Sequence, residues 1–112
     1  MIDIGGKNPV FITADRTNRF LVVAALQGGA VYVIKRNEDG SLGEIVSETH
    51  LPGKKEGTVS FAHQCIWDQT KTYLFVVTQG RIQGYGQVLV YRFDAENGTL
   101  TETDCFRSRR VR

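Results

Sequence analysis

The sequence is poor in cysteine and proline and has no long hydrophobic run. Two cysteines in 112 residues are too few for a disulfide scaffold, so free thiols in a reducing, cytoplasmic setting are expected. The longest apolar run, residues 20–26, is far shorter than the ~20 residues of a membrane-spanning helix, so no membrane partner is expected. The N-terminus lacks a basic stretch followed by an apolar one, so no secretory signal is predicted.

The chain also lacks a strong net charge, because 14 Lys and Arg residues face 12 Asp and Glu residues. Four of the arginines lie among the last six residues, and without them the acidic residues outnumber the basic ones by two. The rest of the chain therefore has no field that would attract a polyanion. We interpret residues 107–112 as a solvated basic tail and do not expect a nucleic-acid partner.

An internal repeat covers most of the chain. Residues 15–25, DRTNRFLVVAA, align without a gap with residues 68–78, DQTKTYLFVVT. The other aligned segments are residues 31–35 with 88–92 and residues 39–44 with 97–102. The offset grows from 53 (Asp15 to Asp68) to 58 (Asp39 to Asn97), so the second copy carries extra residues, mostly around 80–86. Such insertions are tolerated in surface loops.

Each copy is predicted to form four short β-strands, because segments rich in Val, Ile, Phe and Tyr alternate with turn formers. No segment has a sustained period of 3.6 residues, so little helix is expected. Asp39-Gly40 and Asn97-Gly98 predict tight hairpins, because such pairs accept positive φ angles. The predicted strands are residues 10–13, 20–25, 31–35 and 45–49 in the first copy, and 64–67, 73–78, 88–93 and 101–106 in the second.

Four antiparallel strands in a repeat of roughly 50 residues are the pattern of a β-propeller blade. We predict an all-β fold of two four-stranded antiparallel blades, over residues 9–50 and 62–106 of a partial-propeller domain at 1–106. Segments 20–25 and 73–78 are apolar on both faces, as expected for strands packed between neighbouring blades. One eight-stranded sandwich or barrel is the alternative that the pattern leaves open.

The chain is short for a propeller, because propellers typically close with about 4–8 blades. Two blades leave apolar faces and sheet edges open, which favours self-association. We therefore expect the chain to be part of a longer protein, a truncated product, or a subunit that completes a ring with other copies.

Two segments, PVFITADRTNRFLVVA at 9–24 and AHQCIWDQTKTYLFVV at 62–77, resemble the seven-bladed propeller lactonase family. This family includes the propeller-type 6-phosphogluconolactonases of bacteria and the carboxymuconate-lactonizing enzymes of fungi. Residues 31–43 and 88–100 fit the way its blades close. The resemblance implies a hydrolase of carbohydrate metabolism that acts on a small-molecule sugar lactone, with no cofactor and no metal.

The chain departs from the family pattern in three places. Ala25-Leu26 stands where the family has an Asn–aromatic pair, and Thr78 stands where its second blade has an Asp. Residues 53–57 replace a longer loop that often carries an Arg-Gln pair. A non-catalytic propeller module that binds or assembles with other protein, or a truncated remnant, is therefore the alternative function.

His63 is the candidate catalytic residue. It matches the histidine that opens the corresponding strand in the family, and the first strands of blades line the central channel of a propeller. Opening a lactone requires a base that activates water and a donor that stabilises the oxyanion. Histidine can move protons near neutral pH. A histidine that is only hydrogen-bonded at a strand end is the alternative interpretation.

Arg81 is a second, substrate-binding candidate, because a loop guanidinium can hold a phosphate or carboxylate with two hydrogen bonds. A solvated loop arginine is the competing interpretation. Cys65 follows His63 by two residues, so both side chains are expected on one side of the strand. Two ligands do not make a zinc site, and Cys65 is interpreted as a core residue. If the 112 residues are the whole protein, negligible lactonase turnover is expected.

Overall fold

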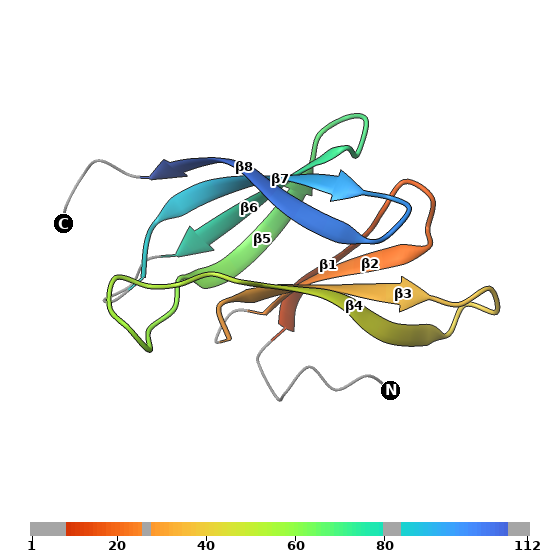
Figure 1. Cartoon of the computed structure of the whole chain (residues 1–112), viewed down its shortest axis with the longest axis horizontal. Helices are drawn as coiled ribbons and strands as arrows, with labels where there is room; N and C mark the ends of the chain where they lie inside the picture. The colour runs from red at the N-terminus through yellow and green to blue at the C-terminus, as the bar shows by residue number, and fades with distance from the viewer. Residues whose placement is uncertain (1–8, 26–27, 80–83, 108–112) are drawn as a thin grey trace.

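The computed structural model describes residues 9–25, 28–79 and 84–107, which form two four-stranded antiparallel sheets (Figure 1). Within each sheet the strands follow chain order, and among the described residues no strand pairs with a strand of the other sheet. The first sheet holds β1 (Pro9–Ala14), β2 (Phe20–Ala25), β3 (Ala30–Arg36) and β4 (Leu42–His50). The second holds β5 (Phe61–Trp67), β6 (Tyr73–Gln79), β7 (Gln87–Asp94) and β8 (Thr99–Arg107). The predicted all-β fold of two four-stranded antiparallel sheets is confirmed, and a single closed barrel is excluded.

The turns β1–β2 and β5–β6 are each built around an aspartate, Asp15 and Asp68. One carboxylate oxygen of each accepts two backbone N–H groups at the start of the next strand. The donors are Arg19 (2.9 Å) and Phe20 (3.0 Å) for Asp15, and Thr72 (2.9 Å) and Tyr73 (3.0 Å) for Asp68. Asn18 and Lys71, at equivalent positions, take left-handed φ angles of 61° and 56°. The same aspartate hydrogen bonds therefore stabilise the equivalent turn in both sheets.

The hairpins β3–β4 and β7–β8 form where Asp39-Gly40 and Asn97-Gly98 predict them. Only the glycines take positive φ angles, 89° at Gly40 and 74° at Gly98. These loops are therefore not mirror-image turns with two left-handed residues, but turns that end on a left-handed glycine. Gly98 has a second constraint, because a Cβ atom built there would lie 2.6 Å from the Phe20 ring. Close packing between the sheets thus requires glycine at this position.

Each sheet has a front face and a back face, which we define by strand β2 and its equivalent β6. The front face carries Val22 in the first sheet and the equivalent Phe75 in the second, and the back face carries Val23 and Val76. The front face of the first sheet packs on the back face of the second and forms the main core. Its members include Val22, Ala24, Val31 and Val33 from the first sheet and Leu74, Val76, Leu89 and Tyr91 from the second.

The contact between the sheets is closed at one end by three aromatic rings. Phe93 meets Phe20 and Trp67 edge to face, with ring centroids 5.8 and 5.3 Å apart. The indole N–H of Trp67 donates a hydrogen bond to the Thr13 hydroxyl at 3.2 Å. Trp67 therefore lies between the sheets, and its polar group has a partner on the opposite sheet.

No helix among the described residues is long and apolar enough to cross a membrane. Of the predicted basic tail, residues 108–112 lie outside the described part of the chain.

Candidate functional site

The candidate catalytic residue, His63, lies on β5, the first strand of the second sheet. Strand β5 packs against β1 and β2, so the first strands of the two sheets lie close together (Figure 1). The outer strands β4 and β8 make fewer contacts with one another. His63 is thus carried by the edge where the two sheets converge, and its side chain is exposed to solvent.

A β-bulge sets the direction of the His63 side chain. Ala62 pairs with Thr78 and Gln64 pairs with Val77, so His63 is an extra residue without a partner of its own in the ladder. Ala62 and Cys65 are buried, whereas both residues between them are exposed. The expectation that His63 and Cys65 share one side is therefore wrong, because the bulge interrupts the simple alternation. The register of β1 also shifts at the equivalent place, between Pro9 and Phe11.

Among the side chains that the structure describes, the imidazole of His63 has one neighbour at hydrogen-bond distance, the amide of Gln79 at the end of β6. The distance from His63 Nδ1 to Gln79 Nε2 is 3.4 Å. An amide can serve either neutral tautomer, because its NH₂ donates and its oxygen accepts. With the amide oxygen toward Nδ1–H, Nε2 of the ring is a free base. Protonation at Nε2 then gives an imidazolium that keeps the same Nδ1–H bond, so this orientation suits both halves of a proton transfer, whereas the NH₂ toward Nδ1 leaves a proton on Nε2.

The sulfur near this site is not a nucleophile. Cys65 is 2% exposed in the core between the sheets, and this burial raises the pKa of its thiol to about 12. Since the thiolate is the reactive form, Cys65 is an inert core residue, as predicted. Arg81, the predicted substrate-binding residue, lies outside the described residues.

Thr78, which stands where the resemblance places an aspartate, is part of the fold rather than an open polar group. Its side chain is buried, and its hydroxyl donates to the carbonyl of Tyr85 at 2.6 Å. The Ser60 hydroxyl accepts from the N–H of Tyr85 at 3.0 Å and donates to the Pro52 carbonyl at 2.9 Å. These bonds tie the segment before β7 to the connection between the sheets, close to the start of β5.

The sequence does not indicate one cavity that the described residues form. A cavity of about 340 Å³ opens between the connection at His50–Pro52 and the back face of β7 and β8. Gln87, Tyr91 and Glu102 line it, and burial, with the Glu102 charge beside it, raises the pKa of Tyr91 to about 12. No motif marks these residues, because they come from separate elements that only the packing of the sheets brings together.

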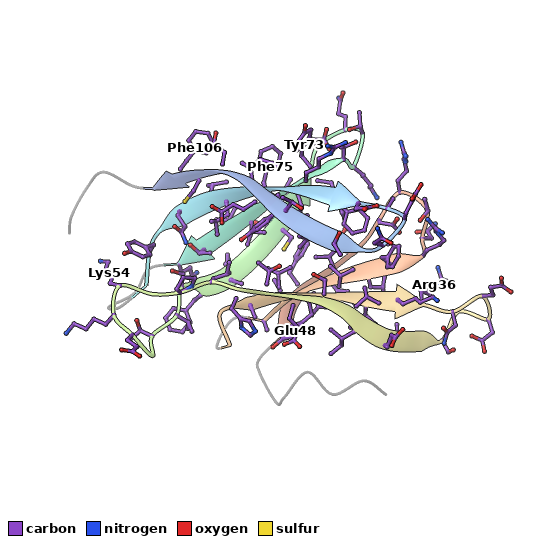
Figure 2. The ribbon with its side chains drawn as sticks, viewed as in Figure 1. Arg36, Glu48, Lys54, Tyr73, Phe75 and Phe106 are labelled. Carbon is purple, nitrogen blue, oxygen red and sulfur yellow. The ribbon has the colours of Figure 1, made fainter. Side chains whose placement is uncertain are left out.

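Within the residues that the structure describes, no group of three His, Cys, Asp or Glu side chains could hold a metal ion. His50 is the exposed last residue of β4, with Nε2 3.6 Å from Glu48 Oε1. Lys54 is exposed in the connection and projects away from the sheets (Figure 2).

Two four-stranded antiparallel sheets, stacked face to back with their first strands together, are neighbouring blades of a β-propeller. The family profile described as "Lactonase, 7-bladed beta-propeller" matches residues 2–110. The chain therefore belongs to this family. No curated protein sequence matches it.

Solved structures share the fold at low sequence identity. The periplasmic gluconolactonase of Pseudomonas aeruginosa is 16% identical, with a TM-score of 0.76 over 94% of this chain and 28% of that one. A Lactobacillus plantarum protein is 13% identical, with a TM-score of 0.77 over 95% and 30%. A candidate 6-phosphogluconolactonase of Bacteroides fragilis is 16% identical, with a TM-score of 0.73 over 92% and 27%. The chain thus spans less than a third of the length of these proteins.

Proposed function

We propose that the chain is part of a lactone hydrolase that opens a sugar lactone, with His63 as the residue that transfers protons. The observation that carries this proposal is the exposed imidazole on the bulged inner strand β5, with the Gln79 amide as its only hydrogen-bonding partner among the described side chains. Family membership supports the reaction class, and similar structures named gluconolactonase and candidate 6-phosphogluconolactonase support a sugar lactone as the substrate.

The chemistry assigned to His63 follows from the two states of its ring. As a base, Nε2 takes a proton from water while the water oxygen bonds to the lactone carbonyl carbon. The tetrahedral intermediate then breaks its ring C–O bond, and the protonated imidazole returns the proton to the departing alkoxide. The products are an open-chain hydroxy acid and the unchanged histidine. Gln79 holds the ring in place during both transfers.

The test uses the two histidines of the chain as a matched pair. We expect 6-phosphogluconate, the stable product of 6-phosphogluconolactone, to shift the imidazole NMR signals of His63 and to leave those of His50 in place. Because the chain supplies two blades, its hydrolysis of the lactone is expected to stay close to the buffer rate, so binding is the primary readout. Any rate above the buffer rate should vanish in His63→Ala and persist in His50→Ala. Equal shifts at both histidines, or none at saturating product, would contradict the proposal.

A non-catalytic binding or assembly module is the second candidate function, and Thr78 favours it. The hydroxyl of Thr78 is committed to the Tyr85 carbonyl, so this position offers no free carboxylate to a substrate. The variant Thr78→Asp discriminates between the two functions. If the site is a lactonase site that has lost one group, this variant should raise lactone hydrolysis. If the chain is a non-catalytic module, Thr78→Asp should only destabilise the fold, because it buries a charge.

A further inference from the structure

The cavity between the connection at His50–Pro52 and the back face of β7 and β8 has one wall from each side of the contact between the sheets. The end of β4 and the connection after it form one wall, and the second sheet forms the other. Leu51 and Leu89, which are 1% and 5% exposed, give both walls an apolar part. The volume of about 340 Å³ lies in the range of small-molecule sites, about 300–1,000 Å³. The cavity is therefore a feature of the contact between two packed sheets rather than an uncovered sheet face.

Tyr91 brings to this cavity a hydroxyl group that the fold does not use. The residue is only 3% exposed, and it lines the cavity. Among the described residues, every fully buried polar side-chain atom has a hydrogen-bond partner, but no described group is bonded to the Tyr91 hydroxyl. The hydroxyl oxygen is therefore not fully enclosed by protein, and it faces the cavity. A polar group in such a place is a ready partner for a bound molecule.

The repeat indicates that packing does not require this hydroxyl. Ile34 is the equivalent of Tyr91 in the first sheet, where it belongs to a buried cluster on the back face and is 3% exposed. An apolar side chain thus fills this position where it only has to pack. Tyrosine adds one polar atom, and an almost buried polar atom without a partner destabilises the folded state. A molecule that hydrogen-bonds to the hydroxyl would remove this penalty.

Glu102 determines the charge of the cavity. It pairs with Tyr91 across β7 and β8, so the two side chains lie beside one another on the back face. Burial and the Glu102 charge raise the pKa of Tyr91 to about 12, so the hydroxyl keeps its proton at neutral pH. The described residues that line the cavity include no lysine and no arginine. The electrostatic potential beside Glu102 therefore favours a cation and disfavours an anion.

We propose that this cavity binds a small organic cation, a primary ammonium group attached to a compact apolar body. The ammonium group carries three donors, and the Glu102 carboxylate and the Tyr91 hydroxyl oxygen accept from them. The apolar body lies between Leu51 and Leu89, where it leaves water. Since one water occupies about 30 Å³ of liquid, a cavity of about 340 Å³ has room for a ligand of roughly ten non-hydrogen atoms.

This cation site is separate from the site at His63. His63 lies on the inner strand β5, whereas the second sheet contributes β7 and the outer strand β8 to the cavity. The imidazole that lines the cavity is that of His50. A cation bound there should therefore shift the NMR signals of the His50 ring and leave those of His63 in place. This result is the reverse of the one expected for 6-phosphogluconate, so the two proposals succeed or fail independently.

The experiment is an NMR titration of the purified chain with three compounds of similar shape and different charge. These are 2-phenylethylammonium, the neutral 2-phenylethanol and the anionic 3-phenylpropanoate. For the ammonium compound we expect a dissociation constant on the order of 1 mM, with shifts at the His50 ring and at the backbone amides of Leu51 and Leu89. The alcohol should bind about fivefold or more weakly, and the carboxylate should show no saturable binding.

Three conservative variants test the contacts, and urea unfolding shows that each remains folded. Glu102→Gln should weaken binding of the ammonium compound about tenfold, and Tyr91→Phe, which keeps the ring, about threefold. Glu48→Gln is the control, because Glu48 lies beside His50 but not among the described residues that line the cavity, and it should leave binding unchanged. Equal binding of all three compounds, equal effects of Glu102→Gln and Glu48→Gln, or no His50 shift at the solubility limit of the amine would overturn the proposal.

Discussion

The two sheets show how one sequence pattern leads to two different environments. Strand β2 is buried on both faces, with Val22 on the front and Val23 on the back. Its equivalent, β6, alternates between buried residues on the back and more exposed residues on the front, such as Phe75. Strands β2 and β6 match in length to within one residue. Each is the second strand of its sheet and follows an aspartate turn. What differs is whether another sheet lies over the front face, and the following predictions test that difference.

The largest effect is expected from Val22→Asp, compared with Phe75→Asp at the equivalent position. Val22 is completely buried, so a carboxylate there would have neither water nor a partner, and we expect a loss of about 4 kcal/mol. Phe75→Asp should cost about 1 kcal/mol or less, because the front face of β6 is partly open to water. Urea unfolding followed by circular dichroism measures both values. Similar losses at the two positions would show that the two front faces are equally buried.

A smaller effect is expected from Gly98→Ala, with Gly57→Ala as its control. Both glycines have positive φ angles, but only Gly98 lies against a side chain of the other sheet, that of Phe20. Gly57→Ala should cost about 1 kcal/mol for the backbone alone, and Gly98→Ala about 2 to 3 kcal/mol because the Phe20 ring must also move. Thermal unfolding of the two variants gives the difference. Equal melting temperatures would contradict close packing at the β7–β8 turn.

The two turn aspartates allow a third comparison. Asp15 is 1% exposed, and Asp15→Ala should cost about 1 to 3 kcal/mol because buried N–H groups lose their acceptor. Asp68 makes the same bonds at a more exposed site, and those with Tyr73 and Thr70 hold its pKa below the usual 3.8. Its contribution to stability is therefore present above pH 4 and is lost as the pH falls through the lowered value. Unfolding curves of the wild type and Asp68→Ala should converge below pH 4, and a constant gap would contradict this.

The smallest effect concerns the two thiols. Burial raises the pKa of Cys65 to about 12, whereas Cys105 is partly exposed on β8. Iodoacetamide at pH 8 should therefore modify Cys105 first, and Cys65 only when the sheets separate. Because the folded state disfavours the Cys65 thiolate, stability should fall as the pH rises above about 9, where the unfolded thiol ionises. Mass spectrometry of the labelled chain gives the order, and faster labelling of Cys65 would indicate an open core.

Much of the fold could be predicted from local patterns. The strand at residues 20–25 was predicted with its observed bounds, because its hydrophobic residues lie between an aspartate turn and a glycine pair. The bulge at His63 could not be predicted, because no residue type in Ala62–Cys65 signals an extra residue in a ladder. The hairpin at Gly40 formed as expected, but Asp39 kept a negative φ since the loop closes on the glycine alone.

For the candidate site, the sequence pointed to His63 but not to its partner. Gln79 comes into reach of the imidazole because β5 and β6 are antiparallel, so the start of one strand meets the end of the other. The resemblance showed that Thr78 departs from the family pattern, but only the structure shows that its hydroxyl is bonded to the Tyr85 carbonyl. Hydrogen bonds across loops depend on three-dimensional register, which residue spacing does not encode.

The order of residues alone was enough to define the eight strands, the turns that join them and the repeat that makes two sheets of one kind. These features depend on interactions between near neighbours in the chain, such as those of Asp15 with the residues that follow it. Burial could not be read in the same way, since equivalent residues such as Val22 and Phe75 have different exposures. Whether an apolar side chain is covered depends on the surface that packs against it, and that surface comes from a distant part of the chain or from another molecule.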